Sequence, residues 1–205
     1  ALCEMGKLFA HTQQPGWDEN FNDEDIPLER KRIEQKVAID YLTRAGEKGY
    51  AEAYSCLVSV AIDIAYADDV SDAEGDEMRT KAFGWAKAGA ALDHAQSHLD
   101  LAVFYQCGVG CEEDFDKAEE HYKRAVELGS AAAPASLAIL YDENPDRYAD
   151  KLSEAYYYEF LSRARGHSGS NFEAMENHRK ERIAQLESIK EGYDIEEFCN
   201  RALPR

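Results

Sequence analysis

Two stretches of 17 residues, KAEEHYKRAVELGSAAA at 117–133 and VAIDYLTRAGEKGYAEA at 37–53, overlay without a gap. They share an Arg-Ala pair and, four residues later, a glycine, Gly129 in one copy and Gly49 in the other. Self-similarity at a fixed period marks a stacked repeat architecture. At 205 residues the chain suits one short repeat array rather than several domains.

Further copies complete the pattern. A middle copy runs from Lys81 to Ala95, with Asp93 where the other two have glycine, and a degenerate fourth lies at 154–164. A partner motif at 101–105 recurs 36 residues later at 137–141, and more loosely at 5–9. Each unit is therefore predicted to be helix A, an acidic loop, helix B and a tight turn. Gly129 and Gly49 suit the left-handed position that stops helix B.

Small and large side chains alternate as a helical hairpin requires. Ala102, Ala118 and Ala125 let two helices approach closely, while Leu101 and Tyr122 fill the space between them. One such hairpin cannot bury its apolar face alone, so neighbouring units must stack.

The pattern of Leu101-Ala102-x-x-Tyr105, Gly108-Val109-Gly110, Lys117-Ala118, Tyr122 and Ala125 to Gly129 resembles the Sel1-like repeat family, relatives of the tetratricopeptide repeats. This resemblance implies an all-α, right-handed α-solenoid of about four helix-turn-helix repeats with a C-terminal capping helix. It also implies a protein-binding scaffold without shared catalytic residues. We therefore expect no enzymatic activity and no cofactor.

The predicted array spans 1–167, with units at about 1–50, 51–94, 95–130 and 131–167. Two segments depart from the family pattern: an insert at 10–35, and a loop from Tyr66 to Arg79 in place of a short glycine-rich connection. Residues 168–205 are predicted to form capping helices, because terminal repeats need a partner with a polar outer face. A recognition helix is the alternative for this segment.

Charge limits the classes of partner. The chain has 23 Lys and Arg against 41 Asp and Glu, a formal net charge of −18. Such a balance argues against binding to nucleic acid or anionic lipid and favours a protein partner with a basic surface. No apolar run approaches the roughly 20 residues that span a bilayer. We expect a soluble protein of the bacterial periplasm or cytoplasm that does not insert into a membrane.

The acidic residues gather in the segments predicted to join helix A to helix B. Equivalent loops of a solenoid lie along one edge, so the sequence predicts an acidic rim that binds the partner. Trp17 and Phe21 stand inside the acidic insert and are candidate aromatic anchors. A purely solubilising role for the charge, and folding of both aromatics onto the first repeat, are the alternatives. The rim candidates are Trp17, Phe21, Asp23, Glu24, Asp25, Asp68, Asp69, Asp72, Glu74, Asp76, Glu77, Glu112, Glu113 and Asp114.

The second candidate surface is the concave face lined by helix A, with Tyr54, His94, His98 and Asp100. His94 and His98 have a spacing that metal sites use, but no third ligand is evident, so no metal site is predicted. Cys107 and Cys111 bracket a turn and form either a local disulfide or two thiols.

These observations lead to two functional hypotheses. The resemblance implies adaptors and, in some bacterial relatives, immunity proteins that block a toxic enzyme. An acidic rim suits an inhibitor that covers a basic active-site entrance in a one-to-one complex. The alternative is a general adaptor or envelope-assembly scaffold that binds a peptide or protein on the concave helix-A face.

Overall fold

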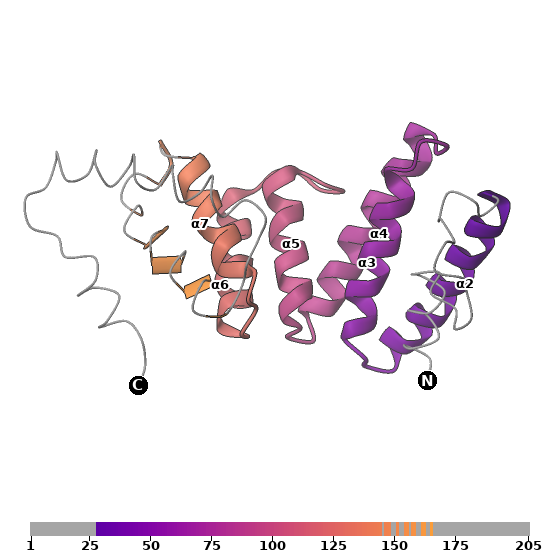
Figure 1. Cartoon of the computed structure of the whole chain (residues 1–205), viewed down its shortest axis with the longest axis horizontal. Helices are drawn as coiled ribbons and strands as arrows, with labels where there is room; N and C mark the ends of the chain where they lie inside the picture. Colours follow the sequence, from indigo (N-terminus) through magenta and orange to yellow (C-terminus); the bar gives the residue numbers. More distant parts are fainter. Residues whose placement is uncertain are drawn as a thin grey trace, which may run out of the picture. The chain divides into compact units, whose positions relative to one another are not determined.

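The computed structural model shows a chain built from α-helices (Figure 1). It describes residues 28–144 and, beyond them, residues 146–148, 151, 154, 155, 157, 158, 161, 162 and 165. The chain divides into two compact units, residues 1–133 and 134–205. Among the described residues there is no β-strand. The predicted all-α solenoid is confirmed.

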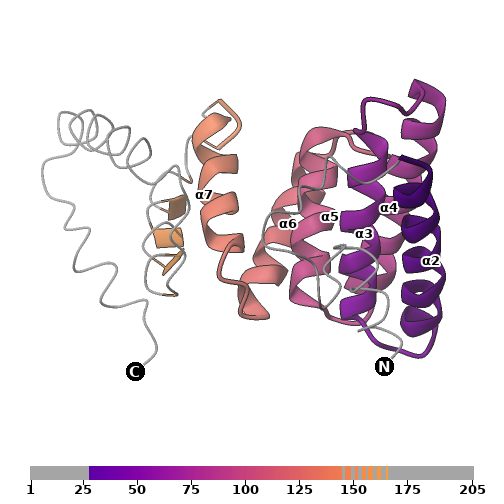
Figure 2. The same ribbon diagram turned by 45° about the vertical axis from the view of Figure 1, so that its right-hand side comes forward.

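The described helices follow the predicted order of hairpins. Helix α2 (Leu28–Glu47) is helix B of the first unit, and α3 (Glu52–Ala65) pairs with α4 (Asp72–Ala90) in the second. The third hairpin is α5 (Ala95–Cys107) with α6 (Phe115–Glu127), and α7 (Ala133–Glu143) is helix A of the fourth unit. Figure 2 shows α2 to α6 of the first compact unit running alternately up and down.

The tight turns between units use the backbone conformation that the repeat predicts. Gly49 and Gly129 have φ of 87° and 88°, in the left-handed region that glycine adopts without a Cβ penalty. Asp93, at the equivalent place, has φ of 54° and is the one non-glycine residue with positive φ in the described part of the chain. Its carboxylate accepts a 2.8 Å hydrogen bond from Arg124 on α6, which ties this turn to the next unit.

Small residues form the contacts inside the first compact unit. One core cluster joins α3, α4 and α5 through Ala61, Ala82, Ala86, Leu101 and Phe104. A second joins α2 to α3 and contains Leu42, Ala45, Ala53, Leu57 and Val60. Five of these ten residues are alanines at the contacts between helices, so the helices pack at short range as the sequence indicates.

One predicted boundary is wrong, because α4 begins earlier than the sequence predicts. The predicted loop from Tyr66 to Arg79 ends at Ser71, whose hydroxyl caps α4 by accepting from the backbone N–H of Glu74. Buried Gly75 and Met78 then continue the helix into the core. Helix α2 begins at Leu28, so the last part of the segment predicted as an insert at 10–35 is helical, and its assignment as an insert stays a prediction.

Other predicted segments cannot be compared with the structure. Residues 10–27 of the insert, the first helix A and the capping helices at 168–205 lie outside the described residues. None of the helices that the structure describes is long and apolar enough to cross a membrane.

Candidate functional site: an acidic edge of the first compact unit

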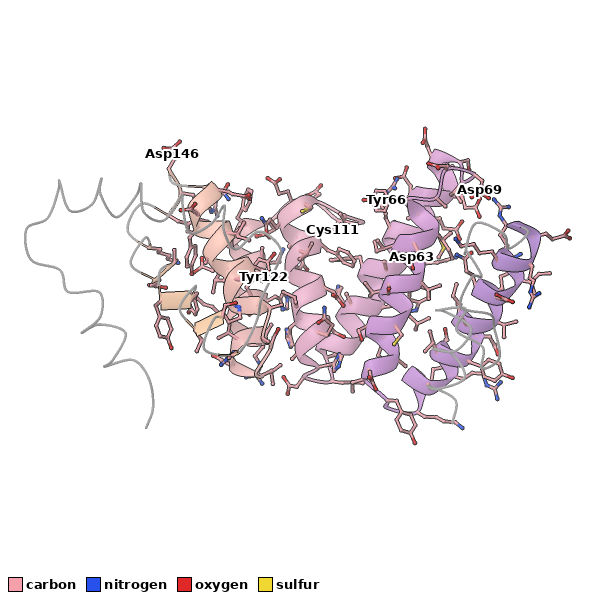
Figure 3. All side chains as sticks on the ribbon, in the orientation of Figure 1. Asp63, Tyr66, Asp69, Cys111, Tyr122 and Asp146 are labelled. Carbon is pink, nitrogen blue, oxygen red and sulfur yellow. The ribbon has the colours of Figure 1, made fainter. Side chains whose placement is uncertain are left out.

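Two helix A to helix B connections lie at the same end of the hairpins, residues 66–71 between α3 and α4 and residues 108–114 between α5 and α6. Gly110 of the second connection packs closely against α4, because a Cβ added there would lie 2.7 Å from the carbonyl carbon of Arg79. Figure 3 shows Tyr66 and Asp69 in the first connection and Cys111 in the second. This acidic edge, residues 66–77 and 112–114, is the predicted rim as far as the structure describes it.

Within the acidic edge, five carboxylates are exposed and have no hydrogen bond or ion pair to any described residue. The set comprises Asp68, Asp72, Glu74, Glu112 and Glu113. Their charge is not neutralised locally, so it acts on an approaching molecule through water and is screened further by salt.

The other four predicted acidic residues of the edge have cationic partners. Asp69 binds Arg32 at 2.8 Å, and Asp76 binds Arg79 at 2.6 Å. Glu77 lies 2.6 Å from Lys81, whose hydrogen bond lowers the pKa of the carboxyl. Asp114 lies 2.6 Å from Lys117, and hydrogen bonds from this lysine lower the pKa of the Asp114 carboxyl. Asp114 also caps α6 by accepting from the Lys117 backbone N–H.

Tyr66 is an exposed aromatic residue on the acidic edge that the sequence reading did not single out. Its side chain is 62% exposed at the end of α3. The Arg79 guanidinium lies 5.4 Å from the ring centroid, and the same group donates to Asp76 and to the carbonyl of Ala65. A signal was present in the sequence, because Tyr66 directly precedes an acidic loop, but tyrosine is also common in a repeat core. The predicted anchors Trp17 and Phe21, with Asp23, Glu24 and Asp25, lie outside the described residues.

The structure separates the candidates for the concave helix-A face. Tyr54 and His98 occupy equivalent repeat positions and pack between helices. The Tyr54 ring lies against Gly46, and His98 is only 7% exposed. His94 precedes α5 and contacts the Ser97 hydroxyl at 3.0 Å instead of sharing a helix face with His98. Tyr54 and His98 therefore pack against neighbouring helices, and His94 lies in the turn before α5.

Asp100 is half-buried on α5. Gln96, one turn earlier, donates a 2.8 Å hydrogen bond to its carboxylate. Burial raises the pKa of Asp100 to about 6, since the charged form loses hydration there. This side chain belongs to a stripe on α5 that is exposed at Gln96, Val103 and Cys107.

The structure contains no cluster of three or more metal-ligating side chains within its described residues. Cys107 and Cys111 are reduced thiols rather than a disulfide. The Cys111 thiol donates to the Phe104 carbonyl at 3.4 Å, and burial raises its pKa.

The fold has a counterpart among solved structures. A Sel1 repeat protein from Oxalobacter formigenes superposes with a TM-score of 0.55 and 16% sequence identity, over 81% of this chain and 58% of that one. The fold is that of a Sel1-repeat solenoid. No family model matches the sequence. At this identity the likeness establishes the Sel1 fold alone, as the repeat spacing predicts.

A sequence relative covers a smaller part of this Sel1-type chain. Activator of C kinase protein 1 of Saccharomyces cerevisiae is 38% identical over 63 residues. The match spans 29% of this chain and 10% of the yeast protein. Less than a third of this chain therefore matches about a tenth of that relative.

Proposed function

We propose that this chain is a non-catalytic scaffold that binds a protein with a basic surface through the acidic edge. The observation that carries the proposal is the group of five locally unpaired carboxylates, contributed by two successive hairpins at one end of the first compact unit. The Sel1-type fold supports it, since repeat solenoids present extended surfaces for binding.

Tyr66 adds an exposed aromatic side chain to the charge of the acidic edge. Aromatic side chains are enriched among the residues that carry most of the energy of an interface. One side of its ring receives Arg79, and the side chain is largely exposed. A tyrosine beside carboxylates suits a lysine or arginine of the partner, which gains from the ring face as well as from the negative charge.

The finer proposal is that binding blocks the partner. An acidic surface that covers a basic active-site entrance captures the enzyme quickly and repels acidic competitors. In this form the chain is a bacterial inhibitor or immunity protein in a one-to-one complex, in the periplasm or cytoplasm. A second candidate is an adaptor that raises the activity of its partner, favoured by the match to a yeast protein named as an activator.

The first experiment is an affinity pulldown from native lysate at about 50 and about 300 mM salt, with mass spectrometry of the retained proteins, since the two concentrations separate screened surface attraction from a packed interface. One basic protein retained in a one-to-one complex supports the proposal. Its activity is then measured with and without the chain. A decrease supports the inhibitor, an increase supports the activating adaptor, and no change contradicts both finer proposals.

Charge-neutralised variants identify the surface. The edge variant replaces three exposed carboxylates that do not cap or begin a helix: Asp68→Asn, Glu112→Gln and Glu113→Gln. The control removes three negative charges at other exposed positions: Glu47→Gln, Glu120→Gln and Glu127→Gln. We expect the edge variant to slow association by roughly tenfold and to weaken its salt dependence, and the control to change association little. Equal effects of the two variants would show that net charge, and not the edge, drives binding.

A further inference from the structure

Two histidines from successive helices meet inside the α5–α6 hairpin. Nδ1 of His98 on α5 lies 3.0 Å from Nδ1 of His121 on α6, with ring centroids 5.2 Å apart. His98 is 7% exposed, and His121 is partly buried. Neither residue lies on the acidic edge, and the proposed function uses neither of them.

A 3.0 Å contact between two ring nitrogens requires one proton between them. A neutral imidazole has one N–H and one bare nitrogen, so one ring must donate from Nδ1 and the other must accept. If both rings are protonated, both Nδ1 atoms carry hydrogen and the bond is lost. The contact therefore depends on the protonation state of the pair.

The other nitrogen of His98 indicates which ring donates. Nε2 of His98 is buried and has no hydrogen-bond partner within the described part of the chain. The acceptor near it is the Asp93 carboxylate, 4.0 Å away, and a backbone hydrogen bond at Ala90 also favours a proton on this ring. A hydrogen on Nε2 is better placed beside this acceptor than a lone pair would be, so His121 is the ring that donates from Nδ1.

The charged groups around the pair come from three elements. Asp93 in the α4–α5 turn attracts a proton on His98, but Arg124 on α6 already binds Asp93 at 2.8 Å and opposes that proton. Glu120 on α6 acts weakly on both rings. The His121 ring also stacks on Tyr105 of α5, with a centroid distance of 5.8 Å. Nζ of Lys117 lies 5.2 Å from the centroid of the same tyrosine ring.

Burial outweighs these attractions. Loss of hydration lowers the pKa of His98, and for His121 the neighbouring His98 lowers the pKa further. Unfolded histidine has its ordinary pKa of about 6.5, so below that pH the unfolded chain binds more protons than the folded one. The folded state is then lost progressively as the pH falls, and its full stability is present above about pH 6.5.

We propose that the His98–His121 pair is an acid-sensitive lock of the α5–α6 hairpin, closed by one shared Nδ1 proton at neutral pH and opened when both rings are protonated. The device regulates the fold itself and holds whether or not the acidic edge binds a partner. It fits a protein whose third repeat must loosen in an acidic environment.

The test compares urea unfolding at pH 7.5 and pH 5.0 in the full chain and in the double variant His98→Phe, His121→Phe. Phenylalanine keeps two rings in contact and removes both titrating groups, a replacement that can be nearly neutral in stability. Each histidine whose pKa folding lowers can raise the unfolding constant by at most about 30-fold over this interval, the limit set by its ordinary pKa of about 6.5 in the unfolded chain. We expect the double variant to reduce the acid-induced rise by at least tenfold, and an equal rise in both proteins would overturn the proposal.

The control is His94→Gln, which removes a neighbouring histidine and leaves the pair intact. Burial also lowers the pKa of His94, so this variant is expected to reduce the rise, but by less than the double variant does. A loss as large as that of the double variant would refute a role specific to the pair. A second measurement does not depend on any variant. Long-range ¹H–¹⁵N spectra of the wild type at pH 7.5 should show one of the two rings protonated at Nδ1 and both rings titrating below 6.5. Two Nε2–H rings, or a titration above 6.5, would also overturn it.

Discussion

Gly89→Ala tests the distance between three helices at one point. Gly89 is buried on α4, and a Cβ added there would lie 2.7 Å from Cβ of Ser97 on α5 and 3.0 Å from Cβ of Tyr54 on α3. It would also meet the Ser97 hydroxyl. Both Cβ atoms are attached directly to backbone, so side-chain rotation cannot relieve the contact. A helix has to move.

The expected magnitude follows from two opposing terms. Alanine in place of glycine inside a helix gains about 1 kcal/mol in stability. Overpacking a close contact costs about 1–3 kcal/mol, and two contacts at or below 3.0 Å place this site at the upper end. We therefore expect Gly89→Ala to lower the free energy of unfolding by about 2 kcal/mol.

A matched control lies on the same helix. Gly84 is exposed, and a Cβ added there has no neighbour within 4 Å. Gly84→Ala should raise the free energy of unfolding by about 1 kcal/mol, so the two variants should differ by about 3 kcal/mol. Urea unfolding followed by circular dichroism measures both. If Gly89→Ala stabilises the protein as much as Gly84→Ala, the close approach of α3, α4 and α5 is refuted.

Three further variants test individual positions by the same urea assay. Gly129→Val should cost more than about 1 kcal/mol, purely from its left-handed φ of 88°, because no atom lies within 4 Å of an added Cβ; a neutral result contradicts the assigned turn. Asp114→Ala removes the N-cap of α6 and should cost about 1 kcal/mol, and an unchanged midpoint would show that the cap contributes nothing. Asp100→Asn should stabilise by about 1–3 kcal/mol at pH 8 and little at pH 4. The sign follows because burial raises the folded pKa of Asp100 to about 6, so wild-type stability falls as the pH rises through that value. Equal stabilisation at both pH values would contradict this cause.

The repeat spacing was sufficient to predict the turns between units. Asp93 is the clearest case, because the alignment with Gly49 and Gly129 places it at a left-handed position, where the structure has φ of 54°. The same spacing did not predict the start of α4. The acidic residues in the first turns of α4 were interpreted as part of a loop. Acidic residues are favourable at a helix N-terminus, however, and the Ser71 hydroxyl caps this one by accepting from the backbone N–H of Glu74.

The candidate binding surfaces were predictable only in part. The sequence placed the acidic residues in the right connections or beside them, and the acidic edge follows from the equivalence of the loops. The sequence predicted that His98 lies on a concave surface. The structure buries this side chain, because His121, 23 residues later on α6, packs against its ring. Such a contact depends on the side chains of the neighbouring helix, which a single-helix pattern does not specify.

The sequence by itself determined the architecture, since small residues and turn glycines recurring at a regular spacing admit a stack of helical hairpins and little else. Only the tertiary structure decided how the charges and rings pair. Asp69 is neutralised by Arg32, 37 residues earlier, while Asp68 beside it remains unpaired among the described residues. The physical reason is distance: an ion pair or a shared proton needs two atoms within about 3–4 Å. That condition is set by the packing of one helix on another.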